Sequence, residues 1–146
     1  MASDRQKRCH SDRSVVLTPL ATIMGRGVSM RTVTSFVFNV TFDCVDPRRV
    51  AAFWAGATGY EVAEERPDFV RLRATDPRGV RHLLFFQVPE PKVGKNRVHV
   101  DLATRDPEAE IARLVALGAT RGEHRSGNAT SWTVMRDPEG NEFCIG

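Results

Sequence analysis

Residues 39–47, with the sequence NVTFDCVDP, recur sixty positions later as residues 99–107, HVDLATRDP. A second pair of similar words, DPRG at 76–79 and DPEG at 137–140, lies at an offset of 61. Similar segments that recur at nearly the same sequence offset indicate a duplicated structural unit. The body of the chain is therefore predicted to consist of two copies of one small structural module.

Each copy contains one predicted helix that follows an Asp-Pro pair. Asp46 and Asp106 can accept hydrogen bonds from the free amides of a first helical turn, and proline is favoured at the first helical position. Apolar residues then recur at helical spacing over 48–57 and 108–117. The glycines that follow, at 59 and 118, suit a left-handed residue beyond each helix end.

Short apolar or alternating stretches predict the strands around these helices. Eight strands are expected, four in each copy: 36–43, 60–65, 68–74 and 82–88, then 97–103, 119–124, 131–136 and 141–145. The predicted fold class is α+β, with two tandem βαβββ modules that form curved sheets around a central cleft. The domain is expected to span 32–146, with module one at 32–90 and module two at 96–146.

Composition places this domain among globular proteins. Of the 146 residues, 41% are hydrophobic and 27% are charged, which is the balance of an ordinary globular chain. No run of 18 apolar residues occurs, so we expect no membrane partner. The three cysteines (Cys9, Cys44 and Cys144) are too few and too scattered for a disulfide framework, so we expect a cytoplasmic protein. Cys44 is expected in the core.

The positive charge lies in the first 31 residues. They carry a net charge of +4, so the remaining 115 residues carry −1. A nucleic-acid partner needs a basic face on the folded domain, so none is expected. Residues 1–31 show no sustained period, and we expect a disordered leader or a start of translation further on, at Met24 or Met30.

Strand alternation predicts which polar side chains share the cleft. The apolar residues of each strand must cover the helix, so the polar ones face the other way. One concave surface is then expected to gather five side chains: Asn39, His99, Asp101, Glu142 and Cys144. They suit metal binding or acid–base chemistry, although a strand histidine beside a carboxylate is as often only a hydrogen-bonded pair. The other histidines (His10, His82 and His124) are expected at the surface.

Five stretches resemble one known family. They are residues 40–54 (VTFDCVDPRRVAAFW), 59–62 (GYEV), 88–102 (VPEPKVGKNRVHVDL), 114–119 (LVALGA) and 132–145 (WTVMRDPEGNEFCI). These stretches resemble the vicinal oxygen chelate superfamily, and more narrowly its glyoxalase-like domains. The resemblance implies paired βαβββ modules, often as a homodimer. In the superfamily's metal enzymes it also implies one ligand in the first and last strand of each module, usually His or Gln, Glu, His and Glu.

When the four ligand positions are transferred to this sequence, only one of them carries the residue type found in the family. The third falls on His99, whereas the first falls on Asn39, the second on Phe86 or Gln87, and the fourth on Cys144. We therefore do not expect the full family metal site, and the cofactor stays unknown. A divalent metal, if bound, would be held by His99, Cys144 and, from two residues away, Glu142.

Three functions remain open. The preferred one is binding of a small organic molecule, with Asn39, Phe86, Gln87, Trp132 and Cys144 as ligand-binding residues. The second is a lyase, isomerase or dioxygenase reaction, with catalytic residues His99, Asp101 and Glu142. The third is a non-catalytic structural or regulatory module. No nucleotide-binding or hydrolase motif is present, and the loops 89–96 and 122–130 would shape any pocket.

Overall fold

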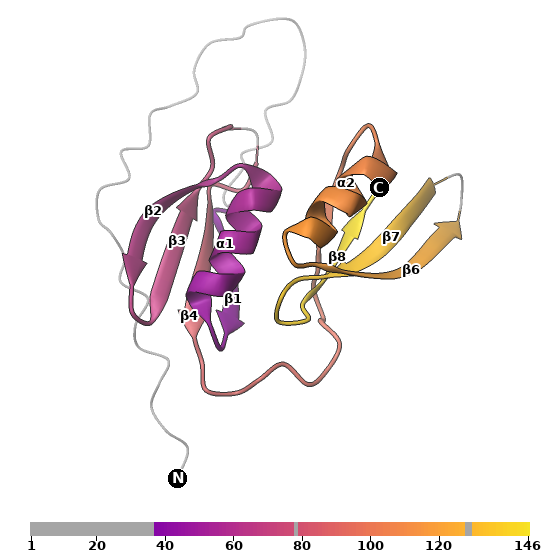
Figure 1. Ribbon diagram of the computed structural model, residues 1–146. Helices are drawn as coiled ribbons and strands as arrows, with labels where there is room; N and C mark the ends of the chain where they lie inside the picture. Colours follow the sequence, from indigo (N-terminus) through magenta and orange to yellow (C-terminus); the bar gives the residue numbers. More distant parts are fainter. Residues whose placement is uncertain (1–36, 78, 128–129) are drawn as a thin grey trace, which may run out of the picture. The chain divides into compact units, whose positions relative to one another are not determined.

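The computed structural model describes residues 37–77, 79–127 and 130–146. The predicted leader, with Cys9 and His10, lies outside the described residues. The described part contains the predicted βαβββ order twice (Figure 1). The first copy holds β1 (Asn39–Cys44), α1 (Pro47–Thr58), β2 (Glu61–Arg66), β3 (Phe69–Arg73) and β4 (His82–Gln87), and the second holds β5 (Val100–Leu102), α2 (Pro107–Ala116), β6 (Thr120–Gly127), β7 (Thr130–Arg136) and β8 (Glu142–Ile145).

The two sheets have the same topology. Their strand orders are β1-β4-β3-β2 and β5-β8-β7-β6, so the first strand of each module pairs with the last. This pairing is parallel in both modules, and the other pairs are antiparallel. A parallel pair needs a long crossover, and the helix followed by two strands supplies it.

Both helices begin at the proline of an Asp-Pro pair, as predicted. Asp46 accepts a hydrogen bond from the Arg49 amide, and Asp106 accepts one from the Ala109 amide, each at 3.1 Å. Gly59 follows α1 with φ of +73°, a left-handed conformation that favours glycine. The predicted helix caps are therefore confirmed.

One hydrophobic core is shared by both modules. Trp54 of α1 and Phe143 of β8 are fully buried, and their ring centroids lie 5.3 Å apart. The same cluster includes Phe85 of the first sheet together with Ile111 and Leu114 of α2. Cys44 is also in this core, as the sequence predicts. The apolar faces of the two sheets and both helices therefore stabilise each other.

Polar contacts also join the modules. Arg113 of α2 donates to the carbonyls of Gly56 (2.7 Å) and Ala57 (3.0 Å) near the end of α1. Glu139, in the turn before β8, accepts hydrogen bonds from the Val45 and Asp46 amides that precede α1. Both ends of α1 are thus held by the second module.

No helix in the described part of the chain is long and apolar enough to cross a bilayer.

Candidate functional site

The second sheet carries a groove on the face that does not contact the core. Its volume is about 1300 Å³, and all of its lining residues lie between Lys95 and Gly146. Trp132 and Val134 provide apolar side chains of the lining. The groove therefore belongs to module two alone.

Alternation along β5 and β8 places the predicted polar residues in this groove. Phe143 and Ile145 point into the core, so Glu142 and Cys144 line the opposite face. Asp101 is paired in register with Cys144, which brings the two strands' polar side chains together. His99 joins them, because it lies two residues before Asp101 on the same face.

Three of these side chains form a close cluster. The Nε2 atom of His99 lies 3.1 Å from Oδ1 of Asp101, and ligand atoms of His99, Asp101 and Cys144 all lie within 4.8 Å of one another. The His99 and Asp101 side chains are 42% and 74% exposed, whereas Cys144 is buried. Burial raises the pKa of the Cys144 thiol, and the neighbouring Asp101 carboxylate raises it further.

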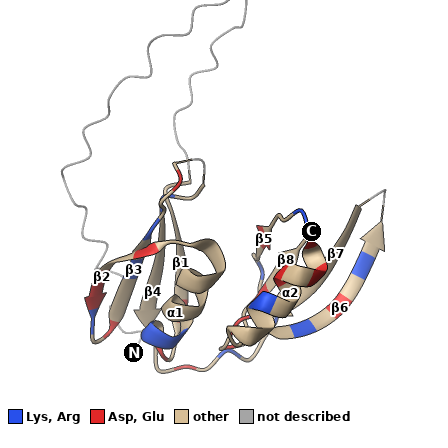
Figure 2. Cartoon of the chain, turned by 45° about the horizontal axis from the view of Figure 1, so that its top comes forward, with Lys and Arg blue, Asp and Glu red and all other residues tan. Residues whose placement is uncertain are grey.

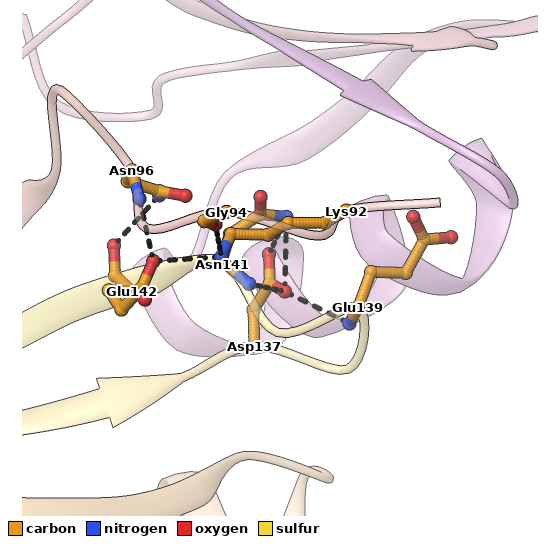
Figure 3. A network of polar contacts seen from close by, with 7 residues as sticks. All are labelled: Lys92, Gly94, Asn96, Asp137, Glu139, Asn141 and Glu142. Atoms are coloured by element: carbon orange, nitrogen blue, oxygen red, sulfur yellow. Dashed lines mark hydrogen bonds and ion pairs between the residues drawn. The ribbon is translucent and has the colours of Figure 1, made fainter. Parts of the chain in front are cut away.

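Glu142 lines the groove but is held by the linker between the modules (Figure 3). Its carboxylate accepts hydrogen bonds from Lys92 Nζ at 3.0 Å and from the Asn96 amide at 3.1 Å. Burial alone would raise the pKa of Glu142, but the Asn96 amide and the Lys92 ammonium outweigh it and lower the pKa to about 2. These contacts give Glu142 an anchoring role for the linker, and its expected catalytic or metal-binding role stays a prediction.

The predicted site residues of module one do not line this groove. Asn39 Oδ1 lies 3.0 Å from His82 Nδ1, within the first sheet. The Phe86 ring packs on Phe69, with centroids 4.6 Å apart, and Gln87 donates to the Val45 carbonyl. The expectation that one concave surface gathers Asn39 with the module-two residues needs correction, because these side chains belong to the other sheet.

His82 is not the surface residue that its place near a turn predicts. It begins β4, is half-buried, and its ring meets the edge of Phe38 at a centroid distance of 5.2 Å. Burial lowers its pKa, and the positive charges of Arg71, Arg81 and Arg73 lower it further. His124, by contrast, is exposed on β6, as predicted.

Three basic groove residues were missed from the sequence: Lys95, Arg125 and Arg136. Alternation from Trp132 would have placed Arg136 on the same face of β7. Arg125 is paired with Glu123 at 2.8 Å, and Figure 2 shows charges of both signs along β6. Among the described residues, Lys95 and Arg136 form no ion pair, so both are free to meet a ligand.

Comparison with known families confirms the resemblance. The family model described as a glyoxalase-like domain matches residues 39–146. The chain belongs to the glyoxalase-like domain family. No curated protein matches the sequence.

Solved structures with the glyoxalase-like fold share it at low identity. A glyoxalase/bleomycin resistance protein/dioxygenase family enzyme from Burkholderia phytofirmans is 21% identical, with a TM-score of 0.61, and the match covers 76% of this chain and 97% of that one. A lactoylglutathione lyase from Agrobacterium tumefaciens is 22% identical, with a TM-score of 0.57 and coverages of 77% and 92%. A bleomycin-binding protein from Streptomyces verticillus is 20% identical, with a TM-score of 0.54 and coverages of 77% and 96%.

The first module of this glyoxalase-like domain does not fit the superfamily's metal set. Asp101 pairs with Cys144, and in the same topology Thr41 pairs with Leu84. The sheet register therefore makes Leu84 the counterpart of Cys144, in place of the expected Phe86 or Gln87. A leucine offers no ligand atom, and the Asn39 amide is already engaged by His82.

Proposed function

We propose that this glyoxalase-like protein binds a small organic molecule in the groove of its second sheet. The observation that carries the proposal is the lining of the groove, where Trp132 and Val134 lie among polar side chains. Ligand sites are mostly apolar, with a few polar groups that fix orientation. The groove volume of about 1300 Å³ exceeds the roughly 300–1000 Å³ of typical pockets. A ligand with several rings, or one that is partly exposed, suits it.

The charges around the groove indicate the polar part of this ligand. Lys95 and Arg136 are free cations within the described residues, and the His99–Asp101 pair offers both a donor and an acceptor. A ligand with an apolar ring system and an acidic group would match this arrangement. The metal set of the superfamily is not needed for such binding.

The related structures support this proposal only through the fold. The neighbour from Streptomyces verticillus is a bleomycin-binding protein, so an organic ligand is compatible with this architecture. The neighbour from Agrobacterium tumefaciens is a lactoylglutathione lyase, which makes catalysis the second candidate. The His99–Asp101 pair in the groove favours that candidate, because an imidazole held by a carboxylate can act as a general base.

Isothermal titration with three probes tests the binding function. The probes are bleomycin, lactoylglutathione and the aromatic sulfonate 8-anilinonaphthalene-1-sulfonate. We expect micromolar binding of at least one probe and loss of that binding in Val134→Asp. Thr41→Asp, an exposed change on the first sheet, is the matched control and keeps the affinity.

Absence of binding for all three probes, or equal binding by Val134→Asp, would contradict the proposed site. Turnover of lactoylglutathione that disappears in His99→Ala would favour the second candidate.

We further propose a cytoplasmic homodimer. The two described cysteines, Cys44 and Cys144, are free, which is typical of a reducing compartment. The family resemblance implies the dimer. Sedimentation equilibrium is expected to give twice the chain mass, and a monomer at all concentrations would refute this part.

A further inference from the structure

A histidine, an aspartate and a cysteine converge at one point of the groove. Ligand atoms of His99, Asp101 and Cys144 lie within 4.8 Å of one another, and the His99–Asp101 contact is 3.1 Å. All three side chains line the groove, so the point between them can be reached from it. Glu142 is not part of this cluster, because the linker engages its carboxylate.

Strand pairing and one side-chain contact bring the three residues together. His99 lies directly before β5, and its Nε2 atom contacts Oδ1 of Asp101 at 3.1 Å. Cys144 pairs in parallel register with Asp101 on the neighbouring strand, and adjacent strands lie roughly 4.8 Å apart. Strand pairing therefore fixes Asp101 beside Cys144, and His99 joins them from the residue before β5.

We propose that His99, Asp101 and Cys144 bind one zinc ion, with the fourth position open to the groove. Imidazole, carboxylate and thiolate are the three ligand types that zinc accepts in proteins. Bond lengths of roughly 2.0–2.3 Å place neighbouring tetrahedral ligands about 3.5 Å apart. Here the His99–Asp101 pair is at 3.1 Å and all three ligand atoms lie within 4.8 Å of one another. A thiolate in the set also selects zinc over the harder metals magnesium, calcium and manganese.

The mobility of two ligands makes the last adjustment easy. His99 and Asp101 are exposed, so their side chains can move toward Cys144 without disturbing the core. Cys144 is 8% exposed and is the fixed member of the set. In the metal-free protein the Asp101 carboxylate faces both the imidazole and the thiol, and a zinc ion would take the place of the hydrogens between them.

Module one is an internal comparison for this site. The same strand positions there carry Asn39, Thr41 and Leu84, which include no thiol, imidazole or carboxylate. The convergence in module two is therefore a property of its residues and not of the fold. It also differs from the superfamily's set, which draws on both modules, since all three ligands come from one sheet of one chain.

Zinc titration of the full chain tests the site. The protein is stripped with EDTA and titrated against a chromophoric chelator of known zinc affinity. We expect one zinc per chain and at least a tenfold weaker affinity in His99→Ala and in Cys144→Ser. Asp43→Asn, an exposed aspartate on β1, and Cys9→Ser are matched controls that keep the wild-type affinity.

Cobalt substitution gives a spectroscopic signal that would not depend on Cys144 if this residue had only a structural role. With cobalt in place of zinc, we expect a thiolate-to-metal charge-transfer band that disappears in Cys144→Ser and persists in Cys9→Ser. No bound zinc, or unchanged zinc affinity in both His99→Ala and Cys144→Ser, would overturn the proposal. Organic ligands are absent from these titrations, so their outcome is independent of the proposed binding function.

Discussion

The indole nitrogen of Trp54 donates a hydrogen bond to Oδ2 of Asp137 across 3.1 Å, and both residues are buried. Trp54 lies in α1 of module one, and Asp137 begins the turn that precedes β8 of module two. The same carboxylate accepts hydrogen bonds from the Glu139 and Asn141 amides (Figure 3). One buried carboxylate therefore organises the turn and fastens it to the other module.

Removal of the indole donor is expected to destabilise the domain. Trp54→Phe keeps an aromatic ring in the core but leaves Asp137 with one donor fewer and a gap beside Phe143. We expect a loss of about 2–4 kcal/mol in the free energy of unfolding, measured by urea denaturation. Trp132→Phe changes the other tryptophan, in the groove, and is expected to cost less than about 1 kcal/mol. Equal effects of the two variants would contradict this role of Trp54.

Glu139 is expected to act as an intermodule cap for α1. Its carboxylate accepts from the Val45 amide at 2.8 Å and the Asp46 amide at 2.6 Å, near the positive end of the helix. Glu139→Ala is expected to lower the free energy of unfolding by about 1–2 kcal/mol. Glu123→Ala removes an exposed ion pair with Arg125 and should cost less than about 0.5 kcal/mol. A Glu139→Ala effect as small as that of the control would refute the capping role.

Glu142 and Lys92 are expected to be energetically coupled. Their side chains are only 12% and 20% exposed, so removal of one partner leaves a poorly solvated charge. Unfolding of Glu142→Gln, Lys92→Met and the double variant should give a coupling energy of about 1 kcal/mol or more. Hydrogen exchange at the Asn96 amide, which donates to Glu142, should accelerate in Glu142→Gln. Additive effects with unchanged exchange would show that the linker is not anchored there.

The lowered pKa of His82 predicts that the stability of the protein depends on pH. Its pKa in the folded protein is lowered, first by burial and then by Arg71 and the other nearby arginines. The unfolded chain therefore takes up a proton at higher pH than the folded one, so stability is complete above the ordinary histidine range and falls as the pH is lowered through it. Unfolding curves between pH 8 and pH 5 should show this loss in the wild type and a smaller loss in His82→Gln. The same loss in both proteins would exclude His82 as its cause.

The fold was predictable from local signals. The repeat, the Asp-Pro words and the glycines at 59 and 118 mark the helix ends, and alternation identifies the strands. All of these signals act within a few residues of the chain, so tertiary contacts do not override them. The largest difference is at β5, which is three residues long where seven were predicted.

The candidate site was predictable only within one sheet. Alternation correctly brought His99, Asp101 and Cys144 to one surface, because strand side chains must alternate. The capture of Glu142 by Lys92 was not predictable, because it depends on the path of an irregular linker. The separation of Asn39 from the groove likewise depends on which face of which sheet is hollowed, and this is set by tertiary packing.

The most direct test of the account is a two-dimensional amide NMR titration with each of the three probes: bleomycin, lactoylglutathione and 8-anilinonaphthalene-1-sulfonate. For at least one probe, the account predicts shifts at the Trp132 indole N–H and at amides of β5, β7 and β8, with the first sheet unchanged. Shifts confined to the first sheet around Leu84 and Phe86, or no shifts with any of the three probes, would contradict the claim that the groove of module two is the binding site.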